Sequence, residues 1–349
     1  MTSSSNEKPT VLLIGGLSHC DEEWKALESK YNLIKFREGT RDQFLANCRA
    51  GVYDKVRGCY RSNVSTAVTG PFNAELIAAL PESWRYIAHN GAGYDNVDVQ
   101  ACTQRGIAVS STPGAVDDAT ADIGIFLMLG ALRQAHVPYM ALREGRWKGA
   151  AQLGHDPRGK TLGILGMGGI GRAMARRARA FGMRIIYHNR RRLADAALEG
   201  GAEYVTFDEL LARSDVLSLN LALNAQTRHI LGAAELARVK PGVVLVNTAR
   251  GALIDETALV DALESGHIAA VGLDVFENEP EVHPGLLSSD RAFLVPHLGT
   301  STYETQRDME LLVIRNLEAA VDRGEMYTLV NEQKDLDWVP KQADTEKVH

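Results

Sequence analysis

The chain has 349 residues, a net charge of −6, 45% hydrophobic residues and 23% charged residues. This length and composition predict about two globular domains and give no support for nucleic-acid binding or a basic membrane-facing surface. No apolar run approaches the roughly 18 residues of a membrane span, the N-terminus has no apolar signal core, and the four cysteines are scattered, so we expect a cytoplasmic protein with reduced thiols.

Short apolar runs alternate with helical patterns through the first 110 residues. The predicted strands are 11–14, 33–36, 55–59, 85–88 and 107–110, and the predicted helices are 21–29, 41–50, 73–80 and 97–105. Strands that alternate with helices predict an α/β fold with a parallel sheet covered on both faces. Residues 117–133 then read as a long helix that is apolar nearly all round. This pattern predicts that the helix is buried and lies at a subunit contact.

Residues 161–192 carry the most informative motif. An apolar strand, Thr161–Leu165, meets a G-x-G-x-x-G turn, and a helix and a second strand follow. This context is the fingerprint of dinucleotide binding. Gly166 allows the tight turn, Gly168 lets the backbone approach a pyrophosphate, and Gly171 allows close packing of helix and strand. The N–H groups of the helix N-terminus face the phosphates.

The residues after the second strand indicate which dinucleotide binds. NAD-binding chains usually place an acid there to hold the ribose 2′-OH. This chain has Asn189, 23 positions after Gly166, followed by Arg190, Arg191 and Arg192. Because arginines suit a 2′-phosphate, NADP(H) is the predicted cofactor. NAD(H) remains possible, and a solvated arginine loop is the alternative interpretation.

Three polar turns follow later strands of the same half. Strands are predicted at 216–221, 243–246, 269–273 and 292–295, and helices at 207–213, 233–239, 256–265 and 302–323. The turns carry Arg250, Glu279 and His297, and a glycine-rich loop at 90–95 follows a strand of the first half. Ligands bind at the carboxyl edge of parallel sheets. An arginine can hold a carboxylate, a histidine can exchange a proton, and a nearby carboxylate can favour its charged form.

At these residues the chain resembles the D-isomer-specific 2-hydroxyacid dehydrogenases, over about residues 10–330. The motifs that carry the resemblance are NGAGYDNVD at 90–98, GKTLGILGMGGIGRAMA at 159–175, VNTARG at 246–251, GLDVFENEP at 272–280 and PHLG at 296–299. Within the family the chain is most similar to glyoxylate and hydroxypyruvate reductases and, through GPFNAELIAALPESW and HDPRGKTLG, to fungal D-mandelate dehydrogenases.

The resemblance implies two Rossmann-like domains and a homodimer. The substrate-binding domain, flavodoxin-like, comprises residues 1–111 and 301–349, and residues 112–300 form an inserted NAD(P)-binding domain. Arg250, Glu279 and His297 match the catalytic triad, and the N–H groups of Ala92 and Gly93 match the substrate-carboxylate site. Combined with the residues derived above, the predicted cofactor-binding set is Thr120, Gly166, Gly168, Gly169, Ile170, Gly171, Asn189, Arg190, Arg191, Leu221, Ala222, Thr227, Thr248, Ala249, Asp274 and Gly299. Ala222 stands where family members often have Pro.

The predicted activity is the reversible, NADPH-dependent reduction of a small 2-oxo acid, such as glyoxylate, hydroxypyruvate or phenylglyoxylate, to the D-2-hydroxy acid. Arg61 and Ser62 follow a first-half strand and are predicted to face the substrate. No metal site is predicted. A formate-dehydrogenase-type relative would have Gln in place of Glu279. A nucleotide-sensing transcriptional corepressor of the C-terminal-binding-protein type also keeps the triad and stays open as an alternative.

Overall fold

The computed structural model describes residues 7–339 and 341–342 and divides into two compact units. One unit runs to Ala115 and resumes at Thr302, and the other is the continuous segment Val116–Ser301. We call them unit 1 and unit 2 and describe each by itself. The predicted domain limits, 111/112 and 300/301, lie within a few residues of these boundaries, and residues 1–6, 340 and 343–349 of the predicted first domain are outside the described part.

Unit 1 is built on a five-stranded parallel sheet with the order β2-β1-β3-β4-β5. This order is the flavodoxin-like one. The strands are β1 (Thr10–Ile14), β2 (Asn32–Phe36), β3 (Val56–Arg61), β4 (Tyr86–His89) and β5 (Ala108–Ser110). The helices are α1 (Asp21–Ala26), α2 (Arg41–Arg49), α3 (Thr66–Thr69), α4 (Ala74–Ala79), α5 (Val99–Gln104) and α14 (Tyr303–Arg323), with 3-10 turns η1 (Leu27–Ser29), η2 (Asn63–Ser65) and η4 (Asn331–Gln333) and a short pair, β13 (Glu325–Met326) and β14 (Lys341–Gln342).

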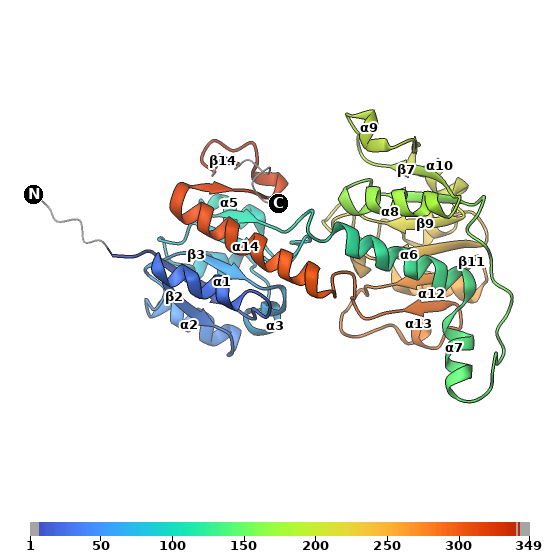
Figure 1. Ribbon diagram of the computed structural model, residues 1–349, viewed down its shortest axis with the longest axis horizontal. Helices are drawn as coiled ribbons and strands as arrows, with labels where there is room; N and C mark the ends of the chain where they lie inside the picture. Colours follow the sequence, from blue (N-terminus) through green and yellow to red (C-terminus); the bar gives the residue numbers. More distant parts are fainter. Residues whose placement is uncertain (1–6, 340, 343–349) are drawn as a thin grey trace, which may run out of the picture. The chain divides into compact units, whose positions relative to one another are not determined.

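Alternate strand residues of unit 1 face two separate cores. Leu12, Ile14 and Cys59 belong to the core that α2, α4 and α5 cover. Val11 and Leu13 face the other side, where they pack with the α14 residues Val313, Ile314 and Leu317. Figure 1 shows α14, drawn in red-orange, beside α1 in this unit. The last long helix therefore covers one face of the sheet to which the first strand belongs.

Unit 2 is built on a seven-stranded parallel sheet with the order β12-β11-β10-β9-β6-β7-β8. This is the Rossmann order with one added strand, and its strand order reverses between β6 and β9. The strands are β6 (Thr161–Leu165), β7 (Arg184–His188), β8 (Glu203–Tyr204), β9 (Val216–Leu219), β10 (Val243–Asn247), β11 (Ile268–Leu273) and β12 (Ala292–Leu294). The helices are α6 (Asp117–Arg133), α7 (His136–Arg143), α8 (Gly169–Ala180), α9 (Ala196–Glu199), α10 (Phe207–Arg213), α11 (Ala233–Leu236), α12 (Glu256–Glu264) and α13 (Pro284–Leu287), with the 3-10 turn η3 (Gly251–Leu253).

The two faces of this sheet are buried by different helices. α6 and α8 lie side by side over one face, where their apolar residues pack with Leu162, Ile164 and Val246 (Figure 1). α10, α11 and α12 cover the other face with Leu217, Leu245 and their neighbours. The α/β fold with two parallel, Rossmann-like sheets is confirmed. Among the described helices, none is both long and apolar enough to cross a membrane.

Candidate active site

Three adjacent strands of unit 2 deliver the predicted catalytic residues to one edge of the sheet. Arg250 follows β10, Glu279 follows β11 and His297 follows β12, and these strands are neighbours. In the parallel register Asn247 pairs with Leu273, and Leu273 with Leu294, so the three turns begin at the same level. The order and register of the three strands therefore bring the three turns together at one edge of the sheet.

His297 and Glu279 form a direct pair. Nδ1 of His297 lies 2.8 Å from Oε2 of Glu279, and the histidine side chain is 43% exposed. This hydrogen bond and the carboxylate charge raise the pKa of His297, against the opposing effects of burial and of the Arg250 charge. Burial raises the pKa of Glu279, but the hydrogen bonds from His297 and the Phe276 N–H, with the charges of His297 and Arg250, lower it overall. Both shifts favour a protonated imidazole next to an ionised carboxylate.

The turn that carries His297 is held by Asp274. This buried side chain accepts hydrogen bonds from the N–H groups of Leu298 and, at 2.8 Å, Gly299, while its carbonyl accepts from the His297 N–H at 2.8 Å. Burial raises the pKa of Asp274, and the two N–H donors partly offset this rise. His297 itself has φ +54°, a left-handed conformation that is uncommon for histidine. The Asp274 bonds hold this turn in shape.

The Arg250 turn packs directly on the Glu279 turn. Oδ1 of Asn247 accepts from the Ala249 N–H at 3.0 Å, and its Nδ2 donates to the Arg250 carbonyl at 2.8 Å. A Cβ on Gly251 would lie 1.9 Å from the carbonyl carbon of Phe276, so only glycine allows this approach. Arg250 lies near enough to the pair for its charge to act on both partners.

The glycine turn after β6 fits a dinucleotide. Gly166 has φ +100°, and a Cβ on Gly171 would lie 2.3 Å from the Gly166 carbonyl oxygen, so the fold itself requires both glycines. A Cβ on Gly168, in contrast, meets no protein atom within 4 Å. The space above Gly168 is thus open to a ligand at the N-terminus of α8, where N–H groups can receive phosphates.

Asn189 and Arg192 make hydrogen bonds within the protein, whereas Arg190 and Arg191 are left for contact with a ligand. Oδ1 of Asn189 accepts from the Met167 N–H at 2.7 Å, which ties the end of β7 to the glycine turn. Arg192 is paired with Glu199 through two hydrogen bonds of 2.7 and 2.9 Å. All three arginines of the run are exposed, and Arg192 differs from Arg190 and Arg191 by its ion pair with Glu199.

The remaining predicted cofactor residues lie near the same edge of unit 2. Leu221 touches the space beside Gly166, and Thr120 approaches Gly299. Thr227 bonds the Ala222 carbonyl at 2.7 Å and so shapes the turn after β9. Gly169 leaves room for the Asp117 carboxylate, and Ile170 lies on the first turn of α8. Thr248 is buried and Ala249 is half-buried.

The predicted carboxylate site in unit 1 is the loop after β4. Ala92 and Gly93 are half-buried there, and no acceptor for either backbone N–H is found among the described residues. The carbonyl of Gly91 accepts from the Thr112 N–H at 3.0 Å, so the loop is anchored to the segment after β5. Two adjacent open N–H groups are suited to an anion.

Arg61 and Ser62 require a correction. We predicted that they face a substrate, but Arg61 is 0% and Ser62 4% exposed. The Arg61 guanidinium contacts Nδ1 of His89, and Oγ of Ser62 accepts from the Gly16 N–H at 3.1 Å. Both side chains thus make contacts inside the protein in place of a substrate contact.

Sequence reasoning missed one residue that supports the site. Glu256, a buried acid in the first turn of α12, accepts a hydrogen bond from the Glu277 N–H at 2.7 Å. The Glu277 carboxylate in turn holds His229 at 2.6 Å and Arg228 at 2.7 Å. These contacts brace the segment before Glu279. In the sequence, an acid in the first turn of a helix is ordinary, so nothing there marked Glu256 as buried.

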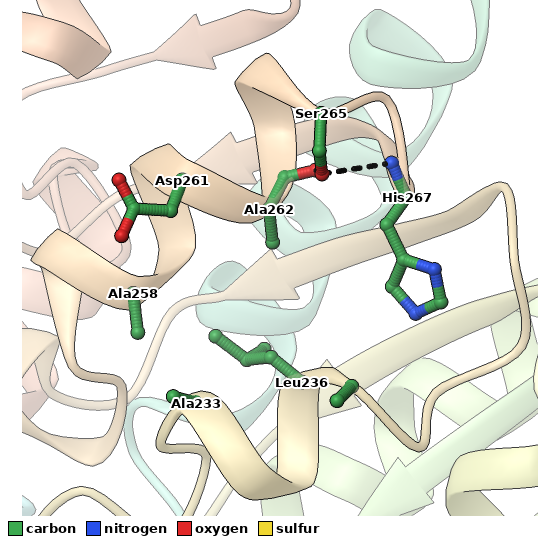
Figure 2. Close-up of a pocket in the computed structure, with 8 residues that line it drawn as sticks. Ala233, Leu236, Ala258, Asp261, Ala262, Ser265 and His267 are labelled. Atoms are coloured by element: carbon green, nitrogen blue, oxygen red, sulfur yellow. Dashed lines mark hydrogen bonds between the residues drawn. The ribbon is translucent and has the colours of Figure 1, made fainter.

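A separate shallow pocket lies between α11 and α12 (Figure 2). Its lining is mostly small and apolar, with Asp261, Ser265 and His267 as the polar residues. The Ser265 hydroxyl accepts a 3.4 Å hydrogen bond from the His267 backbone N–H. None of its lining residues belongs to the predicted site. In the described part of the chain, no cluster of three or more His, Cys, Asp or Glu side chains could hold a metal ion.

Comparisons with known proteins agree with this geometry. The sequence model of the "D-isomer specific 2-hydroxyacid dehydrogenase, NAD binding domain" matches residues 125–299. The chain is 63% identical to 4-methyl-2-oxopentanoate reductase A of Aspergillus oryzae, over 94% of this chain and 99% of that protein. It is similar to the crystal structure of a glyoxylate reductase from Paecilomyes thermophila, with a TM-score of 0.93, 66% identity, and coverage of 94% of this chain and 99% of that chain.

Two further structures extend the comparison. The holo D-mandelate dehydrogenase of Rhodotorula graminis has a TM-score of 0.86 at 32% identity, covering 93% of this chain and 98% of that one. An NADPH-dependent glyoxylate/hydroxypyruvate reductase from Sinorhizobium meliloti, in complex with NADP and malonate, has a TM-score of 0.82 at 33% identity, covering 97% and 99%. With the strand order and the paired His297 and Glu279, these similarities show that the chain is an NAD(P)-dependent oxidoreductase that belongs to the D-isomer-specific 2-hydroxyacid dehydrogenases.

Proposed function

We propose that this enzyme reduces a small 2-oxo acid to the D-2-hydroxy acid, with NADPH as the preferred cofactor. The observation that carries the proposal is the 2.8 Å pair of His297 and Glu279, on the strand edge that also bears Arg250. A histidine whose charged form is stabilised by a carboxylate, and a neighbouring guanidinium, are what the reduction of a carboxylate-bearing ketone needs.

The roles of the side chains follow from their chemistry. Arg250 binds the substrate carboxylate and polarises the ketone oxygen, where negative charge grows. His297 donates its Nε2 proton to that oxygen, and Glu279 holds the ring at Nδ1 and stabilises its charged form. The N–H groups of Ala92 and Gly93 are the second set of donors that we propose for the carboxylate. When bound, the cofactor supplies the hydride.

The substrate is the least constrained part of the proposal. The relatives act on side chains that range from none in glyoxylate to branched in 4-methyl-2-oxopentanoate, by their names. We therefore propose the common 2-oxo acid group as the recognised unit. A panel of glyoxylate, hydroxypyruvate, phenylglyoxylate and 4-methyl-2-oxopentanoate, followed at 340 nm with NADPH and NADH, tests it. Failure to reduce any of the four with either cofactor would contradict the proposal.

The cofactor preference is expected to depend on the segment after β7. Asn189→Asp combined with Arg190→Ala should reverse the preference from NADPH to NADH, because an acid repels the 2′-phosphate and one charged donor is lost. One charge-assisted contact is worth about 1.5–3 kcal/mol, or roughly ten- to a hundredfold in affinity. The measurement is kcat/KM for both cofactors. Arg192→Ala is the matched control, since Arg192 is paired with Glu199. Equal use of both cofactors by the unmodified enzyme would refute the assignment.

We further propose a homodimer formed through unit 2. α7 and the segment after it expose Tyr139, Met140, Leu142 and Trp147, each by half or more. Apolar side chains gathered in this way mark association surfaces. Tyr139→Glu with Leu142→Glu is expected to halve the mass measured by light scattering after size exclusion. The control is Leu198→Glu, an exposed leucine on α9. An unmodified protein of monomer mass would contradict the dimer.

The transcriptional corepressor alternative is not favoured, because the relatives reported above are named as reductases and a dehydrogenase. A cytoplasmic location remains part of the proposal. It is supported by the four cysteines, which are free and buried in the described structure.

A further inference from the structure

Arg61 is a buried cation that the proposed chemistry does not use. It ends β3, and burial lowers its pKa to about 10 despite the attraction of Asp95. Its hydrogen-bond partners are neutral: Nδ1 of His89 at 2.9 Å, Oγ1 of Thr66 at 3.0 Å and Oδ1 of Asn96 at 3.3 Å. Burying a guanidinium that has only neutral hydrogen-bond partners is costly, so its position calls for a role.

The Arg61 contact fixes the protonation pattern of His89. A guanidinium can only donate hydrogen bonds, so Nδ1 of His89 must accept and the ring proton lies on Nε2. Nε2 is 3.1 Å from the carbonyl oxygen of Gly93 and donates to it. The Arg61 carbonyl also accepts from the Asn90 N–H at 2.9 Å. Arg61 is therefore linked to the loop after β4 both through its side chain, by way of His89, and through its backbone carbonyl.

The His89 ring sets the path of this loop. A Cβ on Gly91 would lie 2.7 Å from Nε2 of His89, so the backbone rests against the ring. The Gly91 carbonyl, which shares a peptide plane with the Ala92 N–H, is held by Thr112. The Gly93 carbonyl is held by His89. The N–H groups of Ala92 and Gly93 lie between these two fixed carbonyls.

We propose that Arg61 and His89 are positioning residues that aim the N–H groups of Ala92 and Gly93 at the substrate carboxylate. The inference rests on the proposed function for the identity of the anion. It assigns to Arg61 an effect on substrate affinity that acts through His89, without contact with the substrate. Because carboxylate binding is shared by the ground state and the transition state, the expected signature is a raised KM with a smaller change in kcat.

The test compares a single and a double variant. His89→Phe keeps an aromatic ring and removes both nitrogens, and we expect the KM for glyoxylate to rise about tenfold or more, kcat to fall by no more than about threefold, and the KM for NADPH to stay within about twofold. The double variant Arg61→Met with His89→Phe also removes the guanidinium, which loses Nδ1 of His89 as an acceptor in the single variant. The double variant should regain the melting temperature that the single variant loses, because no buried guanidinium donor is left unpaired. Its KM for glyoxylate should stay high.

A control separates positioning from general instability. Leu27→Ala removes a buried side chain from the other core of unit 1, so it should lower the melting temperature and leave the KM for glyoxylate unchanged. An unchanged glyoxylate KM in both variants, or its recovery together with stability in the double variant, would overturn the inference.

A second readout does not depend on turnover. Hydrogen exchange should become faster in residues 90–96 of His89→Phe and stay unchanged in β1 and α2. Unchanged exchange in the loop would overturn the positioning role even in an enzyme that reduces every 2-oxo acid in the panel. Conversely, a panel without turnover refutes the proposed function while this exchange measurement still decides whether Arg61 and His89 hold the loop.

Discussion

His297→Ala is expected to lower turnover by about a hundredfold or more in both directions, because it removes the group that exchanges a proton with the substrate oxygen. His297→Asn is the better-matched companion, since asparagine tolerates the left-handed backbone found at this position and cannot act as the acid. Steady-state kcat for reduction and oxidation gives the answer. Full activity in either variant would remove His297 from the mechanism.

The same residue sets the pH dependence, and the sign can be worked out. Reduction needs the imidazolium, so kcat/KM should fall as pH rises through the His297 pKa. Oxidation needs the neutral ring, so kcat/KM should fall as pH drops through it. The hydrogen bond and charge of Glu279 raise the pKa of His297 above its ordinary value. Glu279→Gln removes that charge and should move both limbs to lower pH.

Both profiles must be measured for the unmodified enzyme and for the glutamine variant. His297→Ala should flatten both limbs, which identifies the titrating group. Limbs that stay in place in Glu279→Gln would show that the carboxylate does not tune the histidine. A solvent isotope effect on kcat distinguishes this result from one in which slow cofactor release hides the proton transfer.

Arg250→Ala is expected to damage both binding and turnover. One guanidinium is assigned two charge-assisted contacts, with the substrate carboxylate and with the ketone oxygen. Each is worth about 1.5–3 kcal/mol, so kcat/KM should fall roughly a hundredfold to ten-thousandfold. Arg250→Ala also removes the 2.8 Å hydrogen bond from the guanidinium to the Ala249 carbonyl. The Asn247 bonds to the backbone of this turn do not involve the Arg250 side chain and remain in the variant.

Arg250→Lys should recover only part of the loss, because an ammonium lacks the planar fork. Arg213→Ala is the control: its exposed ion pair with Glu203 lies on α10 and should contribute little. Kinetics for glyoxylate and a competitive carboxylate inhibitor separate affinity from turnover. A lysine variant with unmodified kinetics would mean that Arg250 acts only as a positive charge, or not at all.

The catalytic turns could be anticipated from the sequence because each follows an apolar strand. Parallel strands end at a common edge, so Arg250, Glu279 and His297 needed only the correct strand order to meet. Arg61 could not be placed in this way. Its neighbours Cys59 and Tyr60 face opposite cores and are both fully buried, so alternation at the end of β3 does not tell whether the arginine is exposed. Its partner His89 lies on another strand, 28 residues away.

α7 escaped prediction for a different reason. Pro138 stands in its first turn, where proline is tolerated because the N–H would lack a helical partner. Its residues Tyr139, Met140 and Leu142 are exposed by half or more, so no continuous apolar stripe faces the core. The strand predicted to Leu221 ends at Leu219, because the chain turns there toward the glycine motif. Such boundaries depend on tertiary contacts that local sequence does not contain.

The return of α14 to the first sheet has a consequence for how the protein is made. Unit 2 is one uninterrupted segment and can fold as soon as it leaves the ribosome. Unit 1 cannot, because Val11 and Leu13 are covered by Val313, Ile314 and Leu317. At roughly 5–20 residues per second, the chain from Ala115 to Arg323 takes about 10–40 s to synthesise. For that time one face of the nascent sheet is bare, and this interval is when the polypeptide depends most on chaperones and is most exposed to aggregation.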